Sequence, residues 1–286
     1  MKFQTLKRGD MGEDVIFLQT QLNKVGSMLV ADGDFGPGTE KGALYAQDIA
    51  QQPATGIANS VLWEWLDTQA EPFQYLHTNG VAFIAKEETG GLSYYHMVTR
   101  WPHYPGHSSG ITIGVGYDLR FNTENDFKET WGNYLPGTYI DELTNDIGKK
   151  GSKSRSQELK SKGIEVPFKS AWPVLIEHTL PRFYRNTESI YPSLSNLPNL
   201  CRSVLVSIVF NRGASLSGSR RKEMKEIQNI LKLADNKNLS KEKVKELLKG
   251  VEEQILSMKR LWSPESGLIK RRQAEANLWR KGLASW

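Results

Sequence analysis

The apolar positions along the chain predict mostly helices, with one short strand-like run near the middle. Near the start, four apolar residues recur at the spacing that places side chains on one face of an amphipathic helix. These residues are Val15, Leu18, Leu22 and Val25. A loop rich in Gly, Pro and Asp follows, and Thr39 can cap the helix that comes after it.

A third short helix is expected from Asn59, or the residue after it, to Leu66. The next stretch is polar and ends near a proline, as linkers often do. We therefore predict a three-helix domain at residues 1–67, a linker at 68–73 and a second domain at 74–286.

The second domain is predicted to begin with a helix around residues 81–85, followed by a loop at 99–110. In the segment ITIGVGYDL, Ile111, Ile113 and Val115 alternate with small or polar residues, which is typical of a strand. The glycines in this segment permit a bulge or a close approach of the backbone. The pattern is then helical to the end of the chain.

Later segments complete the predicted fold. Residues 151–163 are basic and Ser-rich, which predicts an exposed loop, and residues 201–210 predict a very apolar, buried helix. A further amphipathic helix has an apolar stripe that we expect to pack on a core. Its members are Val244, Leu247, Leu248, Val251, Ile255 and Met258. The predicted fold class is α+β, with a small three-helix N-terminal domain and a mostly helical second domain that holds a small β-sheet.

Composition limits the class of protein. The 286 residues are 38% hydrophobic and 10% aromatic, which argues against wholesale disorder, and no window is apolar enough for a membrane span. The start of the chain shows no signal peptide, so we expect synthesis in the cytoplasm, and another factor would have to release the protein if it acts outside the cell. The one cysteine, Cys201, lies in an apolar run and is expected to be buried, and we expect no cofactor or metal.

Charge is unevenly distributed. Residues 1–70 hold five Lys/Arg and nine Asp/Glu, a net charge of −4, whereas residues 71–286 hold 32 and 23, a net charge of +9. A basic region suits a polyanionic partner such as nucleic acid, lipopolysaccharide, teichoic acid or peptidoglycan, and a solvated surface without a partner remains an alternative. No recognised motif supports a nucleic-acid binder.

The N-terminal segments LKRGDMGEDVIFLQTQL and DGDFGPGTEKGAL resemble the peptidoglycan-binding fold of wall hydrolases. The matching positions are Leu6, Gly9, Gly12, Val15, Leu18, Gln19, Leu22, Asp32, Gly33, Phe35, Gly36 and Thr39. The resemblance implies bacterial peptidoglycan as the partner, with these residues serving mainly turns and core. The alternative is a helical bundle without a ligand.

Glycoside hydrolysis needs two acidic functions beside the scissile bond, one of which must be protonated. Ile84 and Glu88 are four residues apart and share a helix face, so a core-facing Ile84 would give Glu88 a half-apolar setting. Glu87 lies about a hundred degrees away and is expected to be more exposed. From spacing alone, either Glu could be a solvated charge at a helix end.

The segment SGITIGVGYDL supplies candidate partners for this acid. Thr112 and Gly114 are expected on one face of the strand, and Tyr117 and Asp118 end it. Asp118 could equally cap the next turn.

Together the two segments resemble the lysozymes of T-even phages and, more closely, the lysozyme-like domain of pesticin, which has a catalytic Thr and Asp six residues apart. The resemblance implies that Glu88 is the general acid, that Asp118 holds the attacking water or stabilises positive charge on the sugar, and that Thr112 orients that water. Tyr117 stands where the phage enzymes have His, and we expect it to contact the substrate. Met97 stands where the phage form has its second carboxylate, which favours Asp118 for that role.

Two later stretches extend the resemblance. VSIVFNRGASLSG resembles the central helix of this superfamily, and Asn211 and Arg212 at its end are expected to reach the glycan. The alternative is that Asn211 caps the helix and Arg212 pairs with a surface acid. GLIKRRQAEANLW resembles the final helix, in which Arg271, Arg272 and Glu275 are expected to be structural.

Three histidines, His96, His103 and His107, raise the possibility of a metal site. Their loop setting, without Cys or an HExxH motif, makes loop histidines near a groove the better interpretation. Trp101 and Tyr104 in the same loop could stack on sugar rings or plug the loop onto the core.

The sequence therefore predicts a modular bacteriophage endolysin, with a peptidoglycan-binding domain and a lysozyme-like glycoside hydrolase domain at 74–286. The expected activity is that of a muramidase, which hydrolyses the bond between N-acetylmuramic acid and N-acetylglucosamine and lyses the cell. We expect a monomer without nucleic acid or integral membrane contact. The alternatives are an antibacterial toxin or bacteriocin with the same chemistry, and a non-catalytic wall-binding or tail structural protein.

Overall fold

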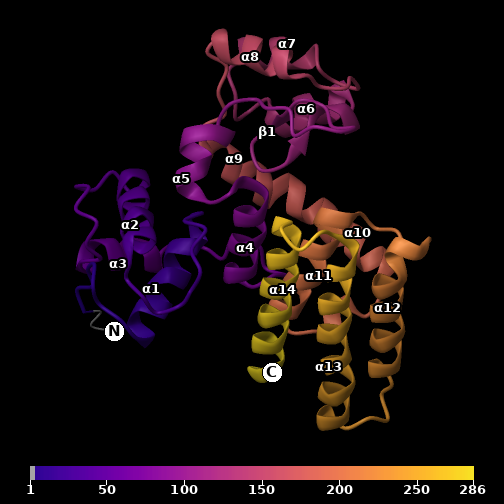
Figure 1. Ribbon diagram of the computed structural model, residues 1–286. Coiled ribbons are helices and arrows are strands. Elements are labelled where there is room, and N and C mark those ends of the chain that lie inside the picture. The colour runs from indigo at the N-terminus through magenta and orange to yellow at the C-terminus, as the bar shows by residue number, and fades with distance from the viewer. Residues whose placement is uncertain (1–3) are drawn as a thin grey trace. The chain divides into compact units, whose positions relative to one another are not determined.

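A computed structural model describes residues 4–286, which are mostly helical with one two-stranded sheet (Figure 1). This confirms the predicted balance of many helices and a small sheet. The chain forms two compact units: the residues up to Pro72 together with Ala85–Leu180, and Phe73–Ile84 together with Pro181–Trp286. No helix among the described residues is both long and apolar enough to cross a membrane.

The helices and strands up to the end of the first unit are α1 (Glu13–Lys24), α2 (Pro37–Ile49), α3 (Ser60–Asp67), α4 (Thr78–Thr89), α5 (Leu92–Tyr94), β1 (Thr112–Ile113), β2 (Tyr117–Asp118), α6 (Glu124–Trp131), α7 (Gly137–Thr144), α8 (Lys153–Ser161) and α9 (Phe168–Val174). Those that follow are α10 (Leu180–Ile190), α11 (Asn199–Arg212), α12 (Lys222–Ala234), α13 (Lys241–Ser257) and α14 (Gly267–Ala284). Short 3₁₀ and π-helical turns join several of them.

The three N-terminal helices form as their apolar spacing predicts. Val15, Leu18 and Leu22 of α1 are fully buried in a common core. The side chain of Asn59 caps α3 by accepting a hydrogen bond from the amide of Leu62 at 3.0 Å. This part of the prediction is confirmed.

The prediction that Thr39 caps α2 is wrong. The helix begins at Pro37, whose fixed φ suits the first helical position, and Gly36 is the N-cap. Thr39 lies one turn inside, where its hydroxyl donates to the carbonyl of Asp34 at 3.1 Å and accepts from the amide of Gln19 at 3.0 Å. Gln19 thereby fastens the glycine-rich loop to α1, since its side-chain oxygen also accepts from the amide of Gly33.

Within the first unit, the N-terminal helices pack directly against the segment that follows α4. A Cβ at Gly26 would lie 2.7 Å from the Phe168 ring and 2.9 Å from the Trp172 ring, so the backbone approaches both closely. The hydroxyl of Thr89 lies 3.3 Å from the sulfur of Met28. The predicted domains separate residues 1–67 from residues 74–286, whereas these contacts place residues 1–72 and 85–180 in one compact unit.

The prediction of one continuous strand in ITIGVGYDL is wrong. β1 and β2 are antiparallel, with Thr112 opposite Asp118 and Ile113 opposite Tyr117. The chain reverses through Gly114 and Gly116, which have φ of +56° and +72°. The apolar alternation that predicted a single strand continues through this turn, because Val115 between the two glycines is buried as well.

The predicted loop at 151–163 is also wrong, since α8 occupies most of it. Ser152 caps this helix by accepting a hydrogen bond from the amide of Arg155 at 3.1 Å. The Arg155 guanidinium pairs with Asp146 at 2.8 Å and with Glu158 at 2.6 Å. Capping and ion pairs stabilise a helix that buries only Leu159.

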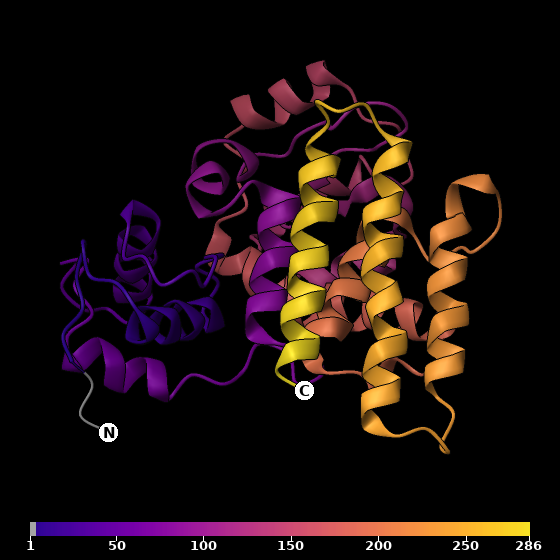
Figure 2. The same ribbon diagram turned by 60° about the horizontal axis from the view of Figure 1, so that its bottom comes forward.

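In the second unit, α12, α13 and α14 lie side by side (Figures 1 and 2). The buried helix predicted at 201–210 forms the centre of α11, and Cys201 in it is fully buried. Burial raises the pKa of its thiol to about 12. The predicted stripe of α13 packs inward through Leu248, Val251 and Ile255, which are all fully buried.

Candidate functional site

The three predicted catalytic residues, Glu88, Thr112 and Asp118, all belong to the first unit. Glu88 lies in the last turn of α4, and Ile84 one turn earlier is fully buried, as the helix-face argument requires. Glu88 is half-buried. Glu87 was expected to be more exposed, but it is half-buried as well, so exposure does not distinguish the two candidates for the acid.

The hairpin brings Thr112 and Asp118 together. They are direct partners across β1 and β2, so their side chains lie on the same face. The amide and carbonyl of Thr112 both bond His103, at 2.8 and 3.0 Å, which leaves Thr112 and Asp118 as a non-hydrogen-bonded pair. In such pairs the Cα atoms are ~4.5 Å apart and the side chains come closest.

The Asp118 carboxylate is fixed by backbone amides. It accepts hydrogen bonds from Gly110 at 2.9 and 3.1 Å and from Arg120 at 2.9 Å, and it caps the short 3₁₀ turn at Leu119–Phe121. A Cβ at Gly110 would lie 2.5 Å from the Asp118 oxygen, so only glycine fits there. The capping interpretation of Asp118 is therefore confirmed, and it holds the carboxylate in one orientation beside Thr112.

His103 extends this row and was missed by sequence reasoning, which placed it only in a loop. Its backbone forms an antiparallel bridge with Thr112, so the His103, Thr112 and Asp118 side chains follow one another across one face. The His103 Nδ1 lies 3.3 Å from the carbonyl of Trp101, which can only accept, so Nδ1 carries the proton and Nε2 is an acceptor. Burial lowers the pKa of His103 and keeps it neutral at pH 7.

Tyr117 lies on the opposite face of the hairpin. It pairs with Ile113 and is 4% exposed, and its ring packs edge-on against Trp131 at 5.7 Å. Substrate contact by Tyr117 stays a prediction, and its placement favours a packing role.

Asn211 and Arg212 end α11 in the second unit. Arg212 is 7% exposed, its guanidinium lies 5.2 Å from the Trp262 ring, and it donates to the carbonyl of Arg220. The Asn211 side-chain oxygen lies 3.4 Å from an Arg272 nitrogen. Each residue therefore has packing partners within its own unit, and their contact with substrate stays a prediction.

The remaining loop residues have local partners. The Trp101 ring is contacted by the Arg100 guanidinium at 4.8 Å and the Lys160 ammonium at 5.2 Å, so it has cationic partners within its own unit, and its stacking on a sugar stays a prediction. The Tyr104 hydroxyl donates to the carbonyl of His107 at 3.0 Å. Across residues 4–286, His, Cys, Asp and Glu side chains do not gather in threes that could hold a metal ion.

Comparison with known proteins bears on the N-terminal part. Residues 11–66 match the family described as "Putative peptidoglycan binding domain". No curated protein sequence matches the chain. The family match supports a peptidoglycan-binding module and an interaction with the cell wall.

Proposed function

We propose that the chain is a muramidase that hydrolyses the glycan strands of peptidoglycan. The observation that carries the proposal is the pairing of Thr112 with Asp118 across the hairpin, in the same unit as the half-buried Glu88. Hydrolysis of a glycosidic bond uses two carboxyl groups, one as acid and one as carboxylate, and a hydroxyl beside the carboxylate can orient the attacking water.

The reaction assigns one step to each group. Glu88 gives its proton to the glycosidic oxygen as the bond from that oxygen to the anomeric carbon breaks. Water held by Thr112 and Asp118 attacks the anomeric carbon from the other face of the ring, and Asp118 takes the proton that the water loses. A water-mediated attack inverts the anomeric configuration.

His103 is a positioning residue in this scheme. Its backbone bonds both backbone groups of Thr112, its side chain lies on the same face as that of Thr112, and its neutral imidazole has Nε2 as an acceptor. These bonds fix the strand that presents the Thr112 hydroxyl.

Action on the wall is supported by the peptidoglycan-binding module at 11–66. We extend the proposal to a phage endolysin that is made in the host cytoplasm, reaches the wall after release and acts as a monomer. A bacteriocin with the same chemistry remains the second enzymatic hypothesis. A non-catalytic wall protein would not need Glu88, Thr112 and Asp118.

The test is mass spectrometry of purified peptidoglycan digested by the full chain. A muramidase leaves reducing N-acetylmuramic acid ends, and its products gain one water per cleaved bond. Reducing N-acetylglucosamine ends would assign a different bond, and products without added water would indicate a transglycosylase. An intact polymer would contradict the enzymatic proposal.

A further inference from the structure

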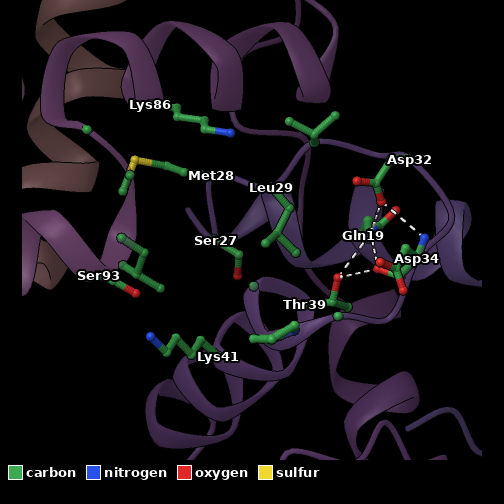
Figure 3. A pocket seen from close by; sticks show the side chains of 17 residues that line it. Gln19, Ser27, Met28, Leu29, Asp32, Asp34, Thr39, Lys41, Lys86 and Ser93 are labelled. Atoms are coloured by element: carbon green, nitrogen blue, oxygen red, sulfur yellow. Dashed lines mark hydrogen bonds between the residues drawn. The ribbon is translucent and has the colours of Figure 1, made fainter. Parts of the chain in front are cut away.

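A pocket of about 360 Å³ lies within the first unit, between the N-terminal helices and the end of α4 (Figure 3). Ser27, Met28 and Leu29 line its middle, the loop before α2 lines one side, and Lys86 together with residues 90–93 lines the other. Small-molecule sites typically occupy ~300–1,000 Å³, so the pocket can hold a ligand of a few residues at most.

The charges in the pocket are separated. Lys86 of α4 and Lys41 of α2 lie on opposite sides of its middle, and Asp32 and Asp34 stand together at one end (Figure 3). Neither lysine forms an ion pair with any residue in 4–286, in contrast to Lys24, which lies 3.6 Å from a Glu71 oxygen. The pocket therefore offers two unpaired ammonium groups and, at a separate end, two carboxylates.

The walls of the pocket are held in place by packing. The Thr89 hydroxyl contacts the Met28 sulfur at 3.3 Å, next to the middle of the pocket. Gln19 donates to Asp32 at 2.8 Å and so fixes the acidic end. Preformed walls reduce the entropy that a ligand must lose on binding.

We propose that this pocket binds the peptide stem of peptidoglycan, with Lys41 and Lys86 pairing with stem carboxylates and Asp34 with the ammonium group of the diamino acid. The proposal rests on the proposed function for the source of the ligand, since a wall hydrolase meets these stems on its own substrate. The match at 11–66 concerns the N-terminal module alone, whereas Lys86 lies outside it and makes the site composite.

The position of Lys86 connects binding with the proposed chemistry. Lys86 and Glu88 belong to α4 and are two residues apart, so they point to nearly opposite sides of the helix. A stem held at Lys86 would keep its glycan strand close to the helix that carries the proposed acid, which raises the local concentration of scissile bonds.

The test is calorimetric titration of the full chain with N-acetyl-L-alanyl-γ-D-glutamyl-L-lysine, which carries two carboxylates and one ammonium. We expect saturable binding that is about tenfold weaker in Lys41→Met and in Lys86→Met. Lys7→Met is the matched control, because Lys7 is exposed near the start of the same unit and does not line the pocket, and this variant should bind as the unchanged chain does.

A second peptide tests the acidic end. Replacing its lysine with norleucine removes the ammonium and should weaken binding about tenfold, and Asp34→Asn should remove that difference between the two peptides. Absence of saturable binding, or equal binding by Lys7→Met and the two pocket variants, would overturn the proposal.

Glu88→Gln separates this inference from the proposed function. It should bind the peptide unchanged, because Glu88 does not line the pocket. Peptide binding by a chain that leaves peptidoglycan intact would refute the enzymatic proposal alone, and lysis that survives Glu88→Gln would refute only the assignment of Glu88. Lysis that depends on Glu88, without peptide binding, would refute the pocket alone.

Discussion

Two clusters of polar side chains, one in each unit, differ in the groups that their members bond. In the second unit, Glu275 of α14 is fully buried and accepts hydrogen bonds from Ser207 at 2.7 Å and Arg272 at 2.8 Å. In the first unit, His103, Thr112 and Asp118 form a row across a short hairpin, bonded mainly through the backbone. In the Glu275 cluster the charged side chains bond one another. In the hairpin cluster the bonds are mainly to the backbone, so they fix the strands and leave the side chains available for chemistry.

The difference indicates which cluster holds the fold and which suits a substrate. Burial raises the pKa of Glu275, against the opposing effect of the Arg272 and Arg271 guanidinium groups. Such a cluster is tolerated only while every charge keeps its partner. The predicted structural role of these three residues is confirmed by this packing.

The largest effect on stability is expected from Glu275→Ala. It leaves Arg271 and Arg272 buried without their carboxylate, and breaking a buried ion pair typically costs about 3–5 kcal/mol of unfolding free energy. Chemical denaturation measures the loss. Glu246→Ala is the control, because the Glu246–Lys249 pair is exposed and contributes little. Equal stability of the two variants would contradict the structural role of the buried cluster.

The hairpin cluster should respond in activity more than in stability. Gly110→Ala places a Cβ where the Asp118 oxygen and the Arg120 amide lie, so the carboxylate must move. We expect about a hundredfold loss of glycan hydrolysis, since misplaced catalytic groups cost about that much. Gly137→Ala, which meets no atom within 4 Å, should keep full activity. Similar activity of both variants would show that the position of Asp118 does not matter.

A smaller effect is expected from pH. Because the pKa of His103 is lowered in the folded chain, the unfolded chain binds its proton more readily below the ordinary value of about 6.5. Stability should therefore fall as pH drops from 7.5 to 5.5. His103→Gln should reduce that fall, whereas exposed His107→Gln should not. The melting temperatures at the two pH values measure this fall, and an unchanged fall in His103→Gln would contradict a half-buried, neutral His103.

The smallest effect concerns salt. Residues 71–286 have a net charge of +9, and surface charges beyond about 10 Å are screened at 0.1 M salt. Activity on intact walls should fall several-fold as salt rises, with little change on short soluble glycans. A flat salt profile on walls would mean that the basic surface does not contribute to the interaction.

The sequence predicted a helix correctly where its apolar residues repeat over several turns. Helices with long apolar periodicity were predicted correctly, as at Val15, Leu18 and Leu22. The helix α8 was missed because its Lys- and Ser-rich sequence buries one apolar residue, Leu159. Its stability comes from a cap and ion pairs that a hydrophobic pattern does not report.

The site was predicted in part for a similar reason. The resemblance assigned roles to Glu88, Thr112 and Asp118, but a single strand would have separated Thr112 from Asp118 by six residues. Reversal at Gly114 and Gly116 made them partners. The pairing of His103 with Thr112 could not be predicted, because the register across the intervening loop depends on tertiary contacts.

The most direct test of the account compares lysis of cell walls by Glu88→Gln and Glu87→Gln. The two residues are neighbours on α4 and both are half-buried, so each controls for the other. Circular dichroism should show that both variants are folded. The account predicts that Glu88→Gln loses lysis by ~10²–10⁴-fold or more, the usual contribution of a general acid, while Glu87→Gln stays active. Near-full lysis by Glu88→Gln would contradict the assignment of Glu88 as the acid.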